Sequence, residues 1–191
     1  MTMINSWINA LTKPKETFAA EKANATIGKG VINFLIAGVI TGVMIFVLSL
    51  VIPRLGSVPG IAPNIFSVVL TPIGTIFWAF VGLGISFILA KILGGQGSFT
   101  SLFYLVSLYA VPIALLSWIP LLGFLVALYA VYLFFLALKE SLTLSTGKAI
   151  AVIIIPLVLI GILIAVVVAI VGVALFSAFG AFAPTGAFGL T

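Results

Sequence analysis

The sequence predicts an all-α integral membrane protein with five transmembrane helices. Of its 191 residues, 64% are hydrophobic and only 6% are charged, whereas about a quarter of the residues of a soluble domain are charged. The hydrophobic residues also form long runs, and a helix of about 20 apolar residues crosses roughly 30 Å of hydrocarbon. The expected spans are residues 31–52, 65–90, 99–117, 120–138 and 149–177.

Residues 1–30 form the only sizeable polar segment, and we expect them in the cytoplasm or at the membrane interface. Apolar residues recur at helical spacing at Ile4, Trp7, Ile8 and Leu11, with Asn5, Ser6 and Asn9 on the opposite side. This pattern is typical of a short amphipathic helix in the headgroup layer. Pro14 should end or restart this helix. A second short helix would turn four charged residues toward water, namely Lys15, Glu16, Glu21 and Lys22. A frayed tail is the alternative.

The first two spans contain features of close packing and of bending. Residues 31–52 include Gly38 and Gly42, a spacing of small residues that lets a neighbouring helix approach closely. The span of residues 65–90 is long enough to tilt, and Pro72 within it can introduce a kink.

The third and fourth spans lie in one uncharged stretch, residues 99–138. Its length of about 40 residues is enough for two crossings and too many for one. We place the reversal at residues 117–120, with Trp118 at the membrane interface and Pro120 at the start of the fourth span.

The fifth span follows a polar stretch and carries small residues at intervals of four. These residues, Gly161, Ala165 and Ala169, predict a packing seam between helices. We therefore divide the chain into the N-terminal segment, a five-helix membrane domain of residues 31–179 and an apolar low-complexity tail of residues 180–191.

The distribution of charge predicts the orientation in the membrane. With a cytoplasmic N-terminus, the inner segments hold seven lysines, and the outer loops hold only Arg54. The inner lysines are Lys13, Lys15, Lys22, Lys29, Lys91, Lys139 and Lys148. Because short cytoplasmic loops carry an excess of Lys and Arg, we expect the N-terminus inside and the C-terminus outside. The localisation would be a multi-pass membrane protein, in the cell membrane if the source is prokaryotic.

The residue inventory excludes most chemistry. The chain has no His, Cys or Asp, and its three glutamates lie outside the apolar runs, so we assign no catalytic, cofactor-binding or metal-binding residue and predict that the protein is not an enzyme. The dispersed lysines also lack the clustering of a nucleic-acid interface. Membrane lipids, further copies of the chain or other membrane proteins are the expected partners.

The residues most suited to meet such a partner lie in two predicted cytoplasmic segments. They are Gly94, Gly95 and Gly97 before the third span, and Lys139, Glu140, Ser145, Gly147 and Lys148 before the fifth. Lysines at this level can bind anionic lipid headgroups. The alternative is that these residues only cap helices and anchor them at the interface.

Several ordered motifs resemble the Yip-domain family of Ypt-interacting membrane proteins, especially its compact prokaryotic and archaeal variants. They are KPKETF at residues 13–18, GGQGSF at 94–99, YAVP at 109–112, WIP at 118–120, LKE at 138–140 and LSTGKA at 144–149. The resemblance covers about residues 13 to 175 and implies a five-span fold.

In eukaryotes, members of this family interact with Rab-type GTPases and act in vesicle formation and membrane organisation. This sequence lacks the Asp-Leu-Tyr-Gly-Pro motif of those members, and only about 30 residues precede its first span, which argues against GTPase binding. We expect a non-catalytic protein with a role in membrane organisation or protein interaction. A channel or transporter for a neutral or lipidic substrate is one alternative, and an accessory subunit of a larger membrane complex is another.

Overall fold

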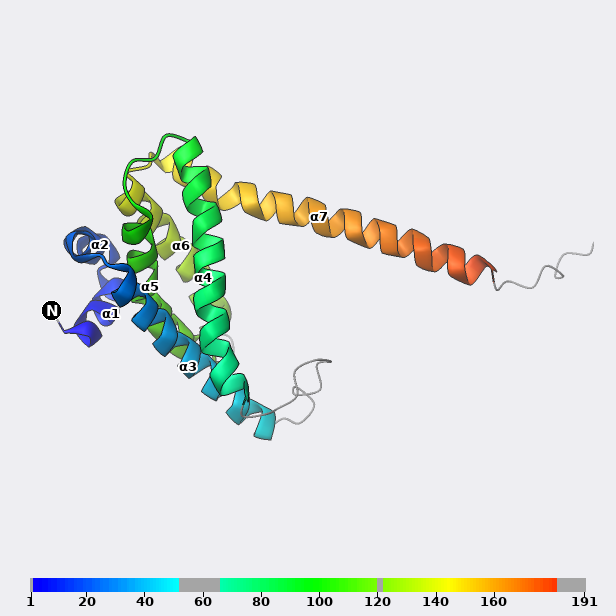
Figure 1. Ribbon diagram of the computed structural model, residues 1–191, viewed down its shortest axis with the longest axis horizontal. Helices are drawn as coiled ribbons and strands as arrows, with labels where there is room; N and C mark the ends of the chain where they lie inside the picture. Colours follow the sequence, from blue (N-terminus) through cyan, green and yellow to red (C-terminus); the bar gives the residue numbers. More distant parts are fainter. Residues whose placement is uncertain (1, 52–65, 120–121, 182–191) are drawn as a thin grey trace, which may run out of the picture. The chain divides into compact units, whose positions relative to one another are not determined.

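A computed structural model describes residues 2–51, 66–119 and 122–181 of the chain, and every regular element in these ranges is helical (Figure 1). The elements are α1 (Met3–Thr12), α2 (Pro14–Glu21), η1 (Lys22–Asn24), α3 (Ile27–Val51), α4 (Phe66–Ile92), α5 (Phe99–Leu116), α6 (Leu122–Leu142) and α7 (Thr146–Ala181). The chain forms two compact units, Met1–Val152 and Ile153–Thr191, so that the first turns of α7 belong to the first unit.

Five of these helices are long and apolar enough to cross a membrane, which confirms the predicted fold class. The candidate spans are Ile27–Leu50, Ser67–Ile92, Phe99–Leu116, Leu122–Leu142 and Thr146–Gly172. The two additional helices, α1 and α2, lie in the N-terminal segment, and Pro14 occupies the first turn of α2 as its missing N–H allows.

Several helices extend further than the apolar runs that predicted them, although α5 ends at Leu116 and not at residue 117. α3 begins at Ile27 and not at residue 31, because Thr26 caps it through its Oγ1, which accepts from the Lys29 amide at 3.2 Å. α6 continues to Leu142 and not to residue 138, and α7 begins at Thr146 and not at residue 149. An apolar run predicts only the part of a helix that lies in the membrane. The helix itself can continue through polar and charged residues, so its ends differ from those of the run by a few residues.

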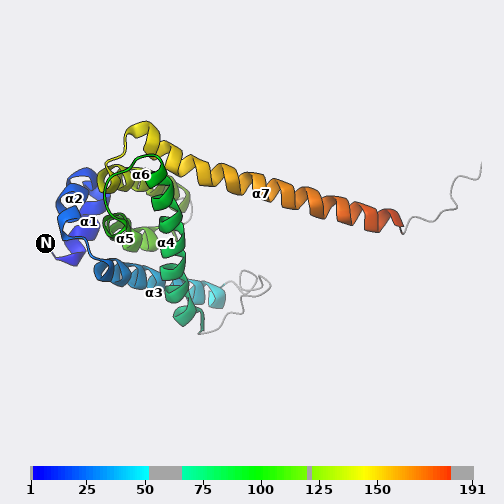
Figure 2. The ribbon, with the colours of Figure 1, turned by 45° about the horizontal axis from the view of Figure 1, so that its top comes forward.

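α5 is the central helix of the first unit, with α3, α4, α6 and the N-terminal helices packed around it (Figure 2). All nine residues from Ser101 to Tyr109 are buried. Phe103 is fully buried and contacts the rings of Phe34 and Phe80, with centroids 5.0 Å and 4.4 Å away. This aromatic cluster joins α5 to α3 and α4.

α3 and α4 approach each other closely at two glycines. A Cβ atom on Gly38 would lie 2.5 Å from the Cα of Pro72, and one on Gly42 would lie 3.0 Å from the carbonyl oxygen of Ser67. A side chain at Gly38 would force one helix to shift, and one at Gly42 would have to displace its neighbours by a few tenths of an ångström, as expected for small residues between membrane helices.

The reversal between α5 and α6 begins where the sequence predicts it. α5 ends at Leu116, and Ser117 to Ile119 form a turn in which the Ser117 amide donates to the carbonyl of Ile113 at 2.9 Å. The predicted role of Pro120 lies outside the described residues, as do the loop with Arg54 and most of the predicted tail, residues 182–191.

The described part of the second unit is α7 beyond Val152, and its side chains from Leu157 to Gly172 are all exposed within the chain. Gly161, Ala165 and Ala169 lie on this exposed stretch, and no atom lies within 4 Å of a Cβ built on Gly161. Their role in helix packing stays a prediction.

Candidate functional site

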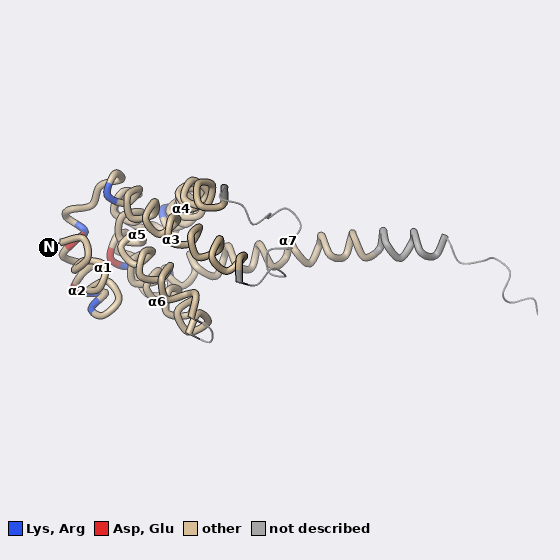
Figure 3. Tube along the Cα trace, turned by 90° about the horizontal axis from the view of Figure 1, so that it is seen from below, with Lys and Arg blue, Asp and Glu red and all other residues tan. Residues whose placement is uncertain are grey.

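The lysines and glutamates of the first unit gather at one end, which also carries α1 and α2 (Figure 3). This arrangement follows from the antiparallel order of the helices. α3, α5 and α7 begin at this end, and α4 and α6 finish there. We call it the charged end. The lysines are therefore placed together by the topology, although they are dispersed in the sequence.

The turn between α4 and α5 packs against the end of α6. The Gln96 amide donates to the carbonyl of Leu142 at 2.8 Å, and a Cβ on Gly97 would lie 2.1 Å from the carbonyl oxygen of Ser141. Gly94 and Gly97 have φ angles of +82° and +117°, which only glycine adopts at little cost. The glycines thus allow the backbone of this turn to lie directly on α6.

The second predicted segment adjoins this turn. Lys139 donates from Nζ to the Oγ1 of Thr146 at 3.0 Å, across the connection between α6 and α7. A Cβ on Gly94 would lie 3.5 Å from the Nζ of Lys148, and Ser145 and Gly147 are exposed beside it. The structure therefore brings together the two sets of predicted residues, Gly94, Gly95 and Gly97 with Lys139, Glu140, Ser145, Gly147 and Lys148. We call these eight residues, of which Gly95 is buried, the turn surface.

The N-terminal helices are held to the charged end by a polar contact and by apolar packing. Lys22 forms an ion pair with Glu140, 4.0 Å from its Oε1, and also donates to the carbonyl of Glu140. The side chain of Lys22 is 33% exposed and that of Glu140 is 40% exposed. Because water screens such a pair, it contributes only about 0–1 kcal/mol to stability. Phe18 of α2 is fully buried and lies against Tyr109 of α5, which gives the stronger attachment.

Glu21 does not face water, and the prediction that it would was wrong. Its side chain is buried, with the Ser6 hydroxyl donating to Oε1 at 2.8 Å and the Tyr104 hydroxyl donating to Oε2 at 3.0 Å. Ser6 was also predicted on the polar face of α1 and is likewise buried. α1 instead exposes Ile4 and Ile8, because its buried residues are the small Ser6 and Ala10.

A second series of hydrogen bonds connects α1 with α3 and α5. The indole Nε1 of Trp7 donates to Asn33 Oδ1 at 3.1 Å, and Asn33 Nδ2 donates to the Ser107 hydroxyl at 3.0 Å. Ser107 in turn donates to the carbonyl of Tyr104 at 2.7 Å. Four helices are therefore connected by polar side chains, all with partners of good geometry.

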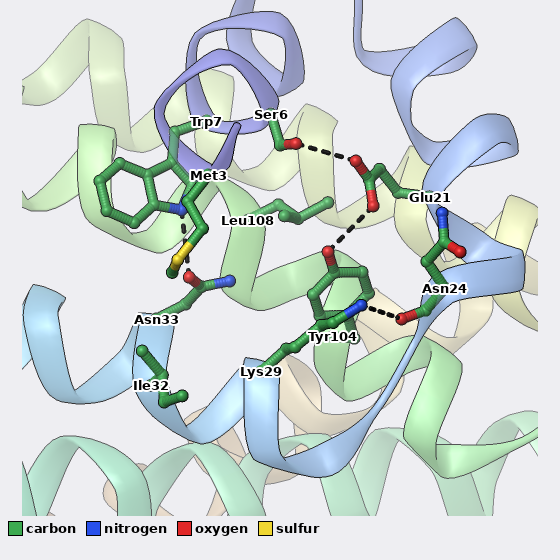
Figure 4. Close-up of a pocket in the computed structure, with 10 residues that line it drawn as sticks. All are labelled: Met3, Ser6, Trp7, Glu21, Asn24, Lys29, Ile32, Asn33, Tyr104 and Leu108. Atoms are coloured by element: carbon green, nitrogen blue, oxygen red, sulfur yellow. Dashed lines mark hydrogen bonds between the residues drawn. The ribbon is translucent and has the colours of Figure 1, made fainter. Parts of the chain in front are cut away.

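These residues surround a cavity of about 330 Å³ (Figure 4). The lining residues are Met3, Ser6, Trp7, Glu21, Asn24, Lys29, Ile32, Asn33, Tyr104 and Leu108. In Figure 4 the Glu21 carboxylate lies between Ser6 and Tyr104, and Lys29 extends past Tyr104 to donate to the carbonyl of Asn24 at 3.0 Å. We call it the Glu21 cavity. Within the described ranges no three carboxylate, thiol or imidazole side chains come together as a metal site would need.

The sequence contained one usable signal for this cavity. Asn33 is the only amide side chain in the first apolar run, and a polar side chain inside a membrane helix usually bonds to a neighbouring helix. Glu21 carried no such signal, since it lies in a segment with other charged residues.

Five helices that are long and apolar enough to cross a membrane, with the lysines and glutamates of the first unit gathered at one end, define a multi-pass helical membrane protein. Residues 8–170 match the model of the Yip1 domain. The chain therefore belongs to the Yip1 domain family, which confirms the resemblance of its ordered motifs. Comparison with curated proteins and with solved structures found no match.

Proposed function

We propose that this protein is a non-catalytic membrane component that organises the bilayer or holds other membrane proteins through its turn surface. One observation carries this proposal. Two turns distant in the sequence are packed into one surface by Gly95 and Gly97, where a Cβ would collide with backbone, with Lys148 exposed and Lys139 partly exposed on it. Such a surface suits contact with a headgroup or a partner.

The charged end lies in the cytoplasm in this proposal, so the N-terminus is inside and the C-terminus outside. The support is the charge distribution. All seven lysines belong to segments that begin or end the helices at the charged end, and Arg54 is the only cation of the opposite loop in the sequence. Positive residues favour the cytoplasmic side, and anionic lipids there add about 1 kcal/mol per lysine near the surface.

The partners we propose are anionic membrane lipids and other membrane proteins, including further copies of this chain. GTPase binding is not part of the proposal, because the motif associated with it is absent from the sequence. Transport of a neutral or lipidic substrate and service as an accessory subunit remain the competing functions.

Purification in native nanodiscs from the source membrane, followed by mass spectrometry of bound protein and lipid, tests the proposal. We expect an enriched anionic lipid, a stoichiometric membrane protein or a homo-oligomer. A protein that retains none of these, yet transports solute into liposomes, would support the transporter alternative. A partner whose own activity is lost on deletion of this chain would support the accessory subunit.

A further inference from the structure

The Glu21 cavity contains a carboxylate without a cation. Glu21 is only 8% exposed, and its two described donors are the neutral hydroxyls of Ser6 and Tyr104. Among the residues that the structure describes, the ion pair closer than or at 4.0 Å joins Lys22 to Glu140 and does not involve Glu21. A carboxylate accepts about four hydrogen bonds, and a buried charge is costly unless it is paired. Glu21 thus has capacity for a further, charged donor.

A lysine lies in the same cavity but is held away from this carboxylate. Lys29 donates from Nζ to the carbonyl of Asn24, and its Nζ lies 5.8 Å from the centroid of the Tyr104 ring. The Tyr104 side chain therefore stands between the two charges, with its hydroxyl at Glu21 and its ring under Lys29. The cavity is therefore lined by the negative Glu21 carboxylate and the positive Lys29 ammonium, which the Tyr104 side chain separates.

The rim of the cavity is apolar on one side. Met3 and Ile32 are each 48% exposed beside it, and Leu108, 1% exposed, closes it from α5. The volume of about 330 Å³ is at the lower end of the roughly 300–1,000 Å³ of ligand sites. A cavity of this size can hold a small zwitterion. An apolar chain attached to the zwitterion could leave the cavity over Met3 and Ile32.

We propose that the Glu21 cavity binds a phosphoethanolamine group, with its primary ammonium on Glu21 and its phosphate on Lys29. A primary ammonium supplies the N–H donors that the carboxylate can still accept, in charge-assisted hydrogen bonds. A quaternary ammonium has no N–H and cannot make them. The group could belong to a phospholipid or to a soluble phosphoethanolamine, and the exposed apolar rim favours the phospholipid. This proposal does not depend on the turn surface, because none of the residues that line the cavity belongs to that surface.

The test uses the full chain in micelles of an uncharged maltoside detergent. Trp78→Phe and Trp118→Phe leave Trp7, in the cavity wall, as the only tryptophan, so its fluorescence reports occupancy. The ligands are short-chain phosphatidylethanolamine, phosphatidylcholine of the same chains and soluble phosphoethanolamine. We expect phosphatidylethanolamine to bind at least tenfold more tightly than phosphatidylcholine. Soluble phosphoethanolamine binding equally well would identify a soluble source, and binding of the lipid alone would identify the headgroup.

Two variants separate the roles of the charges. Glu21→Gln should remove the tenfold preference for the primary ammonium, whereas Glu16→Gln, on the exposed face of the same helix, should keep it. Lys29→Gln, at an exposed position that should not disturb folding, should weaken both phospholipids about tenfold and leave their ratio unchanged. Equal affinity of the wild type for the two phospholipids would overturn the proposal, as would absence of binding by all three ligands. Unchanged binding in Lys29→Gln would do the same even if Glu21→Gln failed to fold.

Discussion

The hydroxyl of Tyr104 donates a hydrogen bond to the carboxylate of Glu21 at 3.0 Å, across 83 positions of the chain. Tyr104 lies in the central helix α5, and Glu21 is the last residue of α2. The N-terminal segment is therefore a structural part of the membrane domain, and its position depends on buried polar contacts as well as on Phe18. The match of the Yip1 domain, which begins at residue 8, includes most of this segment.

Tyr104→Phe should destabilise the attachment of the N-terminal helices. The change removes the donor and leaves a buried carboxylate oxygen with less compensation, so we expect a loss of about 1.5–3 kcal/mol. Thermal unfolding of the purified protein in detergent measures it. Tyr132→Phe is the matched control, because Tyr132 is 44% exposed on α6. Equal effects of the two substitutions would contradict the structural role of the hydrogen bond.

Gly97→Ala should destabilise the turn between α4 and α5. The φ of +117° disfavours any Cβ, and the Cβ would also meet the carbonyl of Ser141, for an expected cost of about 1–3 kcal/mol. In Gly147→Ala no atom lies within 4 Å of the new Cβ, and alanine in a helix is favoured over glycine by up to about 1 kcal/mol. Chemical denaturation of both variants should give opposite signs. A stabilised Gly97→Ala would be incompatible with the packing of this turn on α6.

Gly38→Ala should loosen the contact of α3 with α4. The Cβ would lie 2.5 Å from backbone of Pro72, so one helix must shift, whereas Gly74→Ala in α4 meets no atom within 4 Å. We expect a lower unfolding temperature for the first variant only. Because the chain has no cysteine, introduced cysteine pairs on α3 and α4 can also report the separation through their cross-linking rate. A cross-linking rate and unfolding temperature unchanged by Gly38→Ala would show that the glycine is not needed there.

Single cysteines can determine the orientation of the charged end. Gln96→Cys and Ser145→Cys are exposed at the charged end, and Ser57→Cys lies in the sequence segment of Arg54. With the proposed orientation, a membrane-impermeant maleimide should label the first two only in inverted vesicles and the third only in right-side-out vesicles. The reverse pattern would refute the cytoplasmic position of the charged end.

The sequence was sufficient for the helices and insufficient for the Glu21 cavity, for a physical reason. A span is determined by a local property, the length of an apolar run, so all five were found with ends displaced by a few residues. The burial of Glu21 and Ser6 arises from the packing of α1 and α2 on α5, far along the chain. Charge counting placed the segments of Gly94 and Lys148 on the same side, but the proximity of these two residues depends on α6 lying beside α5.

The most direct test of the proposed function compares what two double variants retain from the source membrane. Lys139→Gln with Lys148→Gln removes two charges from the turn surface, and Lys13→Gln with Lys15→Gln removes two charges from the N-terminal helices, so net charge is matched. After native-nanodisc purification, quantitative mass spectrometry should show the principal bound lipid or protein reduced at least several-fold more in the first variant than in the second. Equal retention in both variants would contradict a role for the turn surface.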